Sequence, residues 1–387
     1  MNILFLDQFS DLGGAQRCLL DLAPAIRERG WAMHAAAPGG GPLLGEMAAH
    51  GAAVDSIACG PYSLGRKTPA DLVRFAAQTP RLAARIRELA ERSRADLVYV
   101  NGPRLLPAVA RGLGASRPVL FHCHSRLSQR YAAGLAGRAL RRTPASVVAC
   151  CRFAAEPLLP YVSAERVRVV YNGAPAAPAR RQAPGESGTW RIGVIGRIAT
   201  EKGQAEFLRA ARLVSPNAPG CRFVVCGEAL FGDAAAQRYR RRLDELAAGL
   251  PVEFLGWRTD VYDVLSGLDL LVVPSVREPA TTRVILEAYA CGVPVVAFRS
   301  GGIPEVVEDA ASGFLVEPLT PEALAAKLGA LLEQPDRLRV AAERGRALWR
   351  ERFTLDRYRR EMLEAILEAC PAAARETAPP PAAQRAP

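Results

Sequence analysis

The sequence predicts an α/β protein of two domains, each with a parallel sheet and helices on both of its faces. Short segments rich in Ile and Val alternate with segments of helical periodicity along almost the whole chain, and this alternation is typical of parallel sheets. The chain has 387 residues, more than one hydrophobic core usually serves, and 50% of them are hydrophobic. We therefore expect a soluble globular protein with one domain in each half.

The first segment, residues 1–7, is apolar, lacks a basic start and is interrupted by Asp7. These features favour a first strand over a secretion signal. After it, Gly13 and Gly14 precede a helix that we expect to run to about Arg29. Glycine lets the backbone approach a ligand closely at such a helix start, and a plain tight turn is the alternative.

Polar side chains stand at the ends of two further strands of the first domain. In the predicted strand 118–124, alternation places His122 and His124 on the same face, near the carboxyl end. His124 is nearer the loop and is the preferred functional residue, whereas a structural histidine is the alternative for each. Asn101 ends the strand 97–101 and points at the same rim.

Positive charge is concentrated in the first domain. Residues 1–175 contain 22 Lys and Arg against 12 Asp and Glu, a net charge of +10, whereas the remainder carries +1. Nine arginines and no acidic residue lie between Leu97 and Ala155, and they include Arg126, Arg130, Arg138, Arg141 and Arg142. A helix resting on an anionic membrane and a solvated basic face are both open interpretations. Nucleic acid is not expected, because aromatic interleaving and recognition motifs are absent from the sequence.

An interdomain linker is predicted at residues 176–189, which are rich in Ala and Pro and have no periodicity. It separates the first domain, at 1–175, from a second domain at 190–350. The prolines suggest a semi-stiff connection.

Two cations follow the first strand of the second domain. A buried strand is predicted at 190–196 and a helix at 206–214, with Arg197 and Lys202 in the turn between them. Ligands of open α/β sheets bind at the carboxyl ends of the strands. A guanidinium can hold a phosphate in two places and an ammonium acts as a mobile point charge. Two solvated loop cations are the alternative.

A second turn of the same kind follows the strand 269–274. The helix after it should begin near Arg283 and end at Gly292, so that its free N–H groups and its dipole favour a phosphate. Thr281 or Thr282 is expected to cap this helix.

Two carboxylates accompany these cations. Glu287 lies one turn below Arg283, where it can accept hydrogen bonds from ribose hydroxyls, and Glu278 lies in the preceding loop within reach of the sugar. A solvated charge is the alternative for each glutamate. Together the cations and carboxylates suit a nucleotide sugar.

Several motifs, in this order along the chain, resemble those of family 4 glycosyltransferases. They are Gly-Gly-Ala-Gln at 13–16, Tyr-Asn-Gly at 171–173, Gly-Arg-Ile-Ala-Thr-Glu-Lys-Gly at 196–203, Val-Pro-Ser at 273–275, the Glu-to-Glu stretch at 278–287, Gly-Val-Pro-Val-Val-Ala at 292–297 and Gly-Gly-Ile-Pro-Glu at 301–305. The resemblance covers about residues 1–370. It implies a GT-B architecture, two Rossmann-like domains with parallel sheets facing a central cleft, and metal-independent transfer that retains the anomeric configuration.

The resemblance also implies roles for the residues singled out above. The catalytic residues would be His124, Arg197, Lys202 and Glu278, and the donor-binding residues would be Gly13, Gly14, Arg197, Lys202, Thr282, Arg283, Val284 and Glu287, with His122 and Asn101 as further candidates. One departure concerns the glutamates, which enclose eight residues here and usually seven in the family. The extra residue must be absorbed in the loop that carries Glu278.

The end of the chain is predicted to form a helix and a tail. Residues 353–370 have an apolar stripe of Leu355, Tyr358, Met362, Leu363 and Ile366. In resembling proteins this helix crosses back to the first domain. Residues 371–387 are rich in Pro and Ala and are expected to be disordered.

The remaining signals concern metals and compartment. No Asp-x-Asp pair and no His/Cys cluster with metal-ligand spacing occurs, so we expect neither a metal nor another cofactor. The nine cysteines are scattered, which indicates reduced thiols. No segment approaches eighteen uninterrupted apolar residues. We expect a cytoplasmic protein, with the inner face of the membrane as a further location.

The function predicted from the sequence is transfer of a sugar from a nucleoside-diphosphate sugar to an acceptor. The acceptor would be a glycan or lipid-linked glycan in surface polysaccharide assembly. Two alternatives stay open, namely a sugar-nucleotide epimerase of the same fold and a non-catalytic protein that binds nucleotide sugars.

Overall fold

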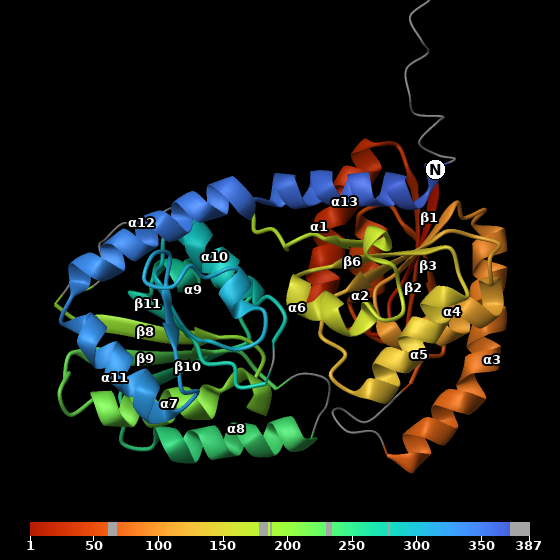
Figure 1. Ribbon diagram of the computed structural model, residues 1–387. Coiled ribbons are helices and arrows are strands. Elements are labelled where there is room, and N and C mark those ends of the chain that lie inside the picture. The colour runs from red at the N-terminus through yellow and green to blue at the C-terminus, as the bar shows by residue number, and fades with distance from the viewer. Residues whose placement is uncertain (61–67, 178–184, 186–187, 230–233, 278, 372–387) are drawn as a thin grey trace, which may run out of the picture. The chain divides into compact units, whose positions relative to one another are not determined.

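The computed structural model describes two compact units (Figure 1). The described residues are 1–60, 68–177, 185, 188–229, 234–277 and 279–371. The predicted tail, apart from Pro371, and most of the predicted linker therefore lie outside them.

The chain passes between the units more than once. The first unit contains Met1–Ala149, Ala155–Val170 and the chain from Arg359 onward, and the second contains Cys150–Ala154 and Tyr171–Tyr358. The first unit ends at Val170 at this final passage, five residues before the predicted border at 175. The five-residue segment Cys150–Ala154 belongs to the second unit through tertiary contacts, which local sequence patterns do not reveal.

The first unit is built on a seven-stranded sheet. Its strands are β1 (Asn2–Leu6), β2 (Ala32–Ala37), β3 (Ala53–Ser56), β4 (Leu97–Val100), β5 (Val119–Cys123), β6 (Ala145–Ala149) and β7 (Val167–Val169). The order across the sheet is β3-β2-β1-β4-β5-β6-β7, and all neighbours are parallel. Every residue of the central strands β4 and β5 is buried, as expected of a parallel sheet covered on both faces.

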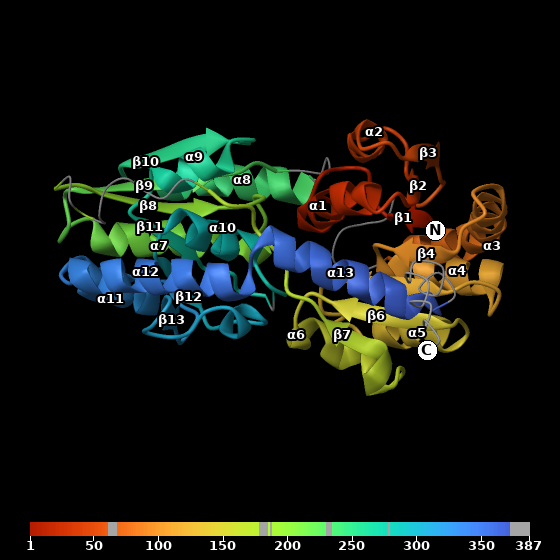
Figure 2. The same cartoon turned by 90° about the horizontal axis from the view of Figure 1, so that it is seen from above.

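Helices connect these strands. They are α1 (Gly14–Glu28), α2 (Leu43–Ala49), α3 (Pro69–Arg92), η1 (Pro103–Leu105), α4 (Leu106–Leu113), α5 (Arg130–Arg141), α6 (Arg152–Ala155, at the passage between the units), η2 (Glu156–Leu158) and η3 (Ala164–Arg166). Figure 2 shows α3, α4 and α5 following one another along this unit, and each packs on the next.

The second unit contains a six-stranded sheet. Its strands are β8 (Trp190–Ile195), β9 (Cys221–Cys226), β10 (Val252–Gly256), β11 (Leu270–Val273), β12 (Val295–Phe298) and β13 (Phe314–Val316). They are arranged in the order β10-β9-β8-β11-β12-β13, again with parallel neighbours. Its helices are η4 (Thr200–Lys202), α7 (Gln204–Val214), α8 (Ala234–Ala247), α9 (Val261–Ser266), α10 (Arg283–Cys291), η5 (Ile303–Glu305), α11 (Pro321–Leu332) and α12 (Pro335–Arg352).

The core of the second unit lies on both faces of its sheet. Leu270 and Val272 of β11 belong to one buried cluster, whereas Leu271 and Val273 belong to another. Successive side chains of a strand point to opposite faces, so a strand buried on both sides is apolar throughout. The uninterrupted apolar run of β11 in the sequence reflects this double burial.

The last helix, α13 (Leu355–Ala369), contains the predicted apolar stripe. Tyr358, Met362 and Ile366 are at most 1% exposed. The helix begins two residues later than predicted, because Phe353 ends α12 and the hydroxyl of Thr354 accepts a hydrogen bond from the N–H of a residue in the first turn of α13.

Most of α13 belongs to the first unit. The guanidinium of Arg359 donates to the carbonyl of Asp21 at 2.7 Å, and Arg168 pairs with Glu364 at 2.6 Å and Glu368 at 2.9 Å. All nine cysteines are free, as predicted. Across the ranges described above, none of the helices combines the length and the apolar character that a membrane crossing needs.

Candidate active site

Arg197 and Lys202 lie at the carboxyl end of β8, as predicted. Arg197 follows the strand after one glycine, and Lys202 ends the short turn η4. The guanidinium of Arg197 pairs with Glu201 at 2.6 Å. The backbone carbonyl of Arg197 accepts a hydrogen bond from the side-chain amide of Gln204 at 2.9 Å. These contacts hold the turn against the start of α7.

The turn between β8 and α7 packs closely against the end of the neighbouring strand β11 at Gly203. This residue has a φ of +73°, and a Cβ added to it would lie 1.8 Å from the carbonyl oxygen of Pro274. The N–H of Val276 donates to the carbonyl of Glu201 at 3.1 Å. The loops after β8 and β11 are therefore in direct contact, as expected from the pairing of the two strands.

Lys202 is a half-buried cation at this edge. Burial, and next the nearby guanidinium of Arg197, lower the pKa of Lys202. Within the described residues no carboxylate lies within 4.0 Å of its ammonium group. A cation in this situation is stabilised by an anion that binds beside it.

The start of α10 is the second part of this edge. Thr282 occupies the position before the first helical residue, but its hydroxyl makes no capping hydrogen bond and is buried without a partner. The hydroxyl of Thr281 instead interacts with Asn172 at 3.4 Å and with the carbonyl of Cys150 at 3.5 Å. The prediction of a threonine cap is therefore wrong, and the N–H groups of the first turn keep no hydroxyl partner.

Arg283 and Glu287 face each other across one turn of α10. The Nε of Arg283 lies 2.8 Å from Oε1 of Glu287, and both side chains are about one-seventh exposed, at 14% and 13%. The arginine thus holds the carboxylate in one orientation. The side chain of Val284 is buried in the core, which anchors the start of the helix. Glu278 lies outside the described residues.

A separate group of polar residues lies in the first unit. His124 directly follows β5, and its Nε2 is 2.7 Å from Oδ1 of Asn101, the residue after β4. The Nδ2 of Asn101 donates to Asp7, which follows β1, at 2.5 Å. Because β1, β4 and β5 are adjacent in the sheet, these three residues meet at the same edge.

The two histidines share a face, as the alternation predicts. Their ring centroids are 3.7 Å apart. Burial lowers the pKa of His124 to about 3, so that its imidazole is neutral at physiological pH. Burial, and then the neighbouring His124, hold the pKa of His122 well below its usual range, and the ring of His122 is hydrogen-bonded to the hydroxyl of Tyr99.

Asp7 was missed as a site residue in the sequence. It is 2% exposed, and burial raises its pKa to about 6 although Asn101, Phe9 and Gln16 donate hydrogen bonds to it. In the sequence it served only to interrupt an apolar run. Asp7 and Asn101 each directly follow a strand. This position at the carboxyl end of a strand marked Asn101 as a candidate, and it marks Asp7 equally well.

The Gly13–Gly14 pair opens α1. Gly13 precedes the helix with a φ of −94°, and its N–H donates to Oε1 of Gln16 at 3.1 Å. A Cβ added to Gly14 would meet nothing within 4 Å. The space over this helix start is therefore open, which is what close approach of a ligand to the backbone requires.

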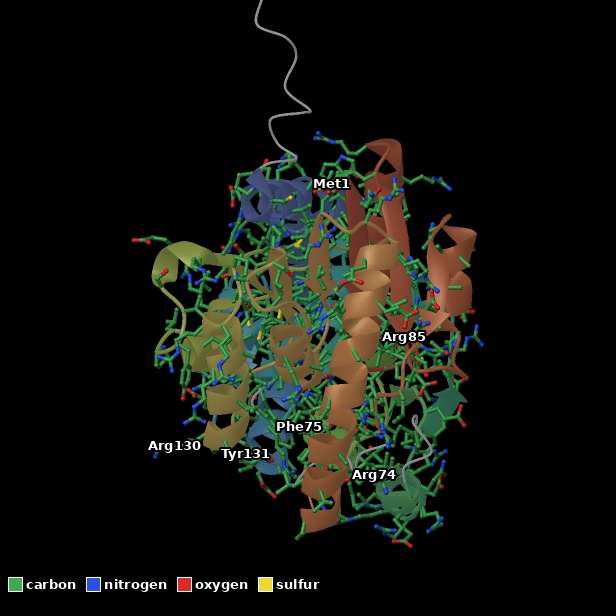
Figure 3. All side chains as sticks on the ribbon, turned by 90° about the vertical axis from the view of Figure 1, so that its right-hand side faces the viewer. Met1, Arg74, Phe75, Arg85, Arg130 and Tyr131 are labelled. Atoms are coloured by element: carbon green, nitrogen blue, oxygen red, sulfur yellow. The ribbon has the colours of Figure 1, made fainter. Side chains whose placement is uncertain are left out.

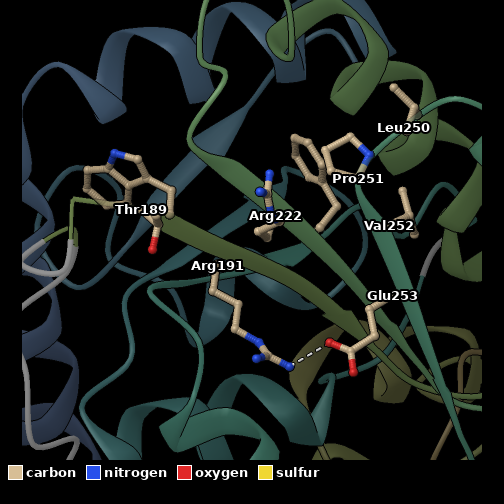
Figure 4. Close-up of a pocket in the computed structure, with 9 residues that line it drawn as sticks. Thr189, Arg191, Arg222, Leu250, Pro251, Val252 and Glu253 are labelled. Carbon is tan, nitrogen blue, oxygen red and sulfur yellow. Dashed lines mark hydrogen bonds and ion pairs between the residues drawn. The ribbon is translucent and has the colours of Figure 1, made fainter.

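A hollow of about 480 Å³ lies elsewhere in the second unit (Figure 4). It is lined by residues at the amino ends of β8, β9 and β10, among them Thr189, Arg222 and Val252, and Arg191 pairs with Glu253 beside it at 2.8 Å. These amino ends lie at the edge of the sheet opposite Arg197 and Lys202. The hollow is therefore not part of the candidate site.

Two family models match the chain. The model described as Glycosyltransferase Family 4 matches residues 12–177, and the model described as glycosyl transferases group 1 matches residues 189–334. Together these ranges take in most of the chain.

Curated relatives match over shorter lengths. The D-inositol 3-phosphate glycosyltransferase of Segniliparus rotundus is 34% identical over 158 residues, which are 40% of this chain and 34% of the relative. The alpha-maltose-1-phosphate synthase of Mycolicibacterium smegmatis is 32% identical over 232 residues, 53% of this chain and 57% of the relative. The chain thus spans from about a third to just over half of the length of these relatives.

Solved structures match over nearly the whole chain. Anabaena Alr3699/HepE in complex with UDP-glucose has a TM-score of 0.80 and 26% identity, and the match covers 95% of this chain and all of the other. Sucrose-phosphate synthase from Thermosynechococcus elongatus has a TM-score of 0.77 at 19% identity, covering 96% and 100% of the two chains, and shows the fold alone. On these matches and on its two parallel-sheet units, the chain belongs to the family 4 glycosyltransferases, with the GT-B architecture.

Proposed function

We propose that the protein transfers a sugar from a nucleoside-diphosphate sugar to an acceptor, with retention of configuration and without a metal ion. The observation that carries this proposal is the shared edge of two paired strands in the second unit: Arg197 and Lys202 follow β8, and the uncapped start of α10 follows β11. The similarity to a protein whose structure contains UDP-glucose supports it, and makes UDP the first diphosphate to test.

The chemistry requires positive charge at the leaving group. When the bond between the sugar and the diphosphate breaks, negative charge grows on the departing phosphate oxygens. Lys202, Arg197 and the free N–H groups of α10 would stabilise that charge, which a divalent ion would otherwise do. The depressed pKa of Lys202 supports this role, because an anion placed there relieves the cost of its burial.

The other parts of the donor have candidate partners in each unit. Glu287, oriented by Arg283, would accept hydrogen bonds from the ribose hydroxyls. Glu278 is proposed for the hydroxyls of the transferred sugar. In the first unit, His124 and the loop of Gly13 and Gly14 would contact the reacting region.

The test is a thermal-shift panel of nucleoside diphosphates and their sugars, followed by turnover assays in the presence of a chelator. A ligand present at a hundred times its dissociation constant stabilises the folded state by about 2.7 kcal/mol. We expect at least one diphosphate to stabilise the protein and its sugar to be turned over with the chelator present. Absence of any shift across the panel would refute the proposal.

The products formed from the donor distinguish the proposed transferase from the two alternatives, an epimerase and a non-catalytic binder. An epimerase would release a free sugar isomer without an acceptor. A non-catalytic binder would be stabilised by a donor but would turn over none of the acceptors offered. The unusual spacing of Glu278 and Glu287 is the observation that favours the non-catalytic binder as an alternative.

We further propose that the acceptor is a glycan or lipid-linked glycan of a surface polysaccharide and that α5 contacts the anionic membrane surface that presents it. Tyr131 and Leu135 of this helix are 54% and 41% exposed. Figure 3 shows Arg130 and Tyr131 standing outward from the start of the helix. Arg138 and Arg142 extend the same exposed surface, and none of these arginines pairs with a carboxylate of the described chain.

A further inference from the structure

A buried hydrogen-bond network joins the Gly13–Gly14 loop to His124. Its centre is the carboxylate of Asp7, which accepts a hydrogen bond from the N–H of Phe9 at 2.9 Å. The amide of Gln16 donates to its two oxygens at 2.9 and 3.0 Å, and Asn101 donates to Oδ2 at 2.5 Å. Gln16 and Asn101 are 4% and 3% exposed, so water does not replace these contacts.

Within the described residues, every hydrogen bond to the carboxylate of Asp7 comes from a donor. A carboxylate accepts at both oxygens, whereas an amide of the same shape would turn an NH₂ group toward another N–H. The network therefore requires a carboxylate at position 7. An apolar or amide side chain would leave buried donors unpaired, each costing about 1–3 kcal/mol.

The groups around Asn101 determine the orientation of its side-chain amide. Its Nδ2 faces Asp7 and also lies 3.4 Å from the carbonyl of Ala15, and both of these groups accept only. Its Oδ1 must therefore face His124, and Nε2 of His124 must carry the hydrogen of the 2.7 Å contact. The neutral imidazole then keeps its lone pair at Nδ1.

The other arm of the network reaches the glycine loop. Because Nε2 of Gln16 is engaged by Asp7, Oε1 of the same amide faces the N–H of Gly13 and accepts from it at 3.1 Å. One carboxylate thus orients both the start of α1 and the imidazole of His124.

We propose that Asp7 is a positioning residue that holds the Gly13–Gly14 loop in place and fixes His124 in the Nε2–H form, so that Nδ1 accepts a hydrogen bond from a hydroxyl of the bound ligand. This proposal rests on the proposed function for the ligand. Among the described groups, the charge of Asp7 also raises the pKa of Tyr99 and of Cys59, for which burial is the largest cause, and both stay neutral.

The tautomer can be measured without a ligand. Nitrogen-15 NMR of the histidine side chains distinguishes Nε2–H from Nδ1–H, and the chain has only four histidines. We expect the Nε2–H form for His124 in the wild type. In Asn101→Leu, which removes the amide but leaves Asp7 bonded to Gln16, the preference should be lost. His34, whose Nε2 is 2.7 Å from Asp55, is the internal control and should not change.

A reciprocal exchange tests the direction of the network. Asp7→Asn should disturb His124 or the glycine loop, because the new amide cannot accept all of the donors. In the double variant Asp7→Asn/Asn101→Asp, the amide at position 7 can donate to the carboxylate at position 101, which can accept from Nε2–H of His124. The double variant should therefore show the Nε2–H form of His124 if Asp7→Asn has lost it.

The turnover rate should depend on the tautomer of His124. We expect Asn101→Leu to lower kcat by up to about a hundredfold with little change in the donor KM, since the residues proposed to hold the nucleotide lie in the second unit. If Asp7 and Asn101 served only to stabilise the fold, the double variant Asp7→Asn/Asn101→Asp would not recover kcat.

The outcomes separate the two proposals. An Nδ1–H form in the wild type, or an unchanged tautomer in Asn101→Leu, would overturn the network whatever the activity. Absence of turnover of every donor by the wild type would refute the proposed function and leave the tautomer result standing. Should Asp7→Asn fail to fold, the double variant Asp7→Asn/Asn101→Asp, in which the two residues can still pair, tests the role of position 7, and loss of the Nε2–H form in it would overturn the proposal.

Discussion

Lys202 and Arg197 are the residues on which the proposed chemistry depends most. Arg197→Ala would remove the proposed charge-assisted contact to the diphosphate, and such a contact is worth roughly 1.5–3 kcal/mol. If the contact strengthens in the transition state, kcat should fall about ten- to a hundredfold. Steady-state kinetics with the best donor of the panel would measure this loss.

A matched variant controls for the loss of an arginine in the same strand region. Arg191 of β8 pairs with Glu253 at the opposite edge of the sheet, and both side chains are about half exposed. Arg191→Ala should leave kcat unchanged. Equal rates for Arg197→Ala and the wild type would remove Arg197 from the mechanism.

Glu287 should act on binding rather than on the chemical step. The ribose is not altered in the reaction, so its contacts are equally strong in the ground and transition states. Glu287→Ala should therefore weaken the binding of the free nucleoside diphosphate by about tenfold, the value of a hydrogen bond to a charged group. Calorimetric titration would test this, and wild-type affinity in the variant would argue against the ribose assignment.

Asp7 should leave a signature in the pH dependence of stability. Burial raises its pKa from 3.8 to about 6, so between these values the folded protein holds a proton that the unfolded chain has lost. The stability contributed by this carboxyl is thus present below the unfolded pKa and is lost as the pH rises through about 6. The slope is at most about −1.4 kcal/mol per pH unit.

Asp7→Asn cannot titrate and should lack this slope, whatever its absolute stability. Urea unfolding of both proteins across the interval between the two pKa values would measure the difference. Parallel stability curves for the wild type and the variant would show that Asp7 does not titrate with a raised pKa.

At the scale of elements, the turn from β8 into α7 is set by one backbone position. Gly203→Ala places a Cβ in a left-handed conformation and against the carbonyl of Pro274, so the turn must shift away from β11. We expect a loss of about 1–3 kcal/mol in the free energy of unfolding, together with weaker binding of the diphosphate.

Gly45→Ala is the control for this prediction. Gly45 lies within α2, its added Cβ would meet nothing within 4 Å, and the change should stabilise or be neutral. If Gly203→Ala behaved like this control, the close packing of the two loops would not constrain the site.

The elements themselves follow closely from the sequence, because buried parallel strands leave strong apolar runs between helical periods. The prediction of α10 from Arg283 to Gly292 is confirmed, with Gly292 in a left-handed conformation at its end. The threonine cap failed for a different reason. Which way a hydroxyl turns depends on neighbours far along the chain, here Asn172 and the carbonyl of Cys150.

At the scale of the whole molecule, the charge distribution makes a further prediction. With a net charge of +10 in residues 1–175, the protein should bind vesicles containing anionic lipid, and added salt should weaken the binding. Arg138→Glu/Arg142→Glu should reduce this binding by about thirtyfold or more, since each cation near such a surface contributes about 1 kcal/mol. Vesicle sedimentation would measure it.

The matched control is Arg241→Glu/Arg242→Glu, which reverses two exposed charges on α8 of the second unit. This control has the same net charge as the first variant. Equal losses in the two variants would indicate a general charge effect and would exclude α5 as the contacting surface.

The sequence by itself determined the fold class, the alternation of strands and helices, and the positions of Arg197, Lys202 and Glu287 at the ends or starts of elements. These are local properties, since periodicity and turn residues are read from neighbouring positions. Only the tertiary structure decided that Asp7, Asn101 and His124 form one network, that Arg283 holds Glu287, and that Cys150–Ala154 belongs to the second unit. Each of these depends on which strands and loops lie beside one another, and on burial, which sets the pKa of Asp7 and of Lys202.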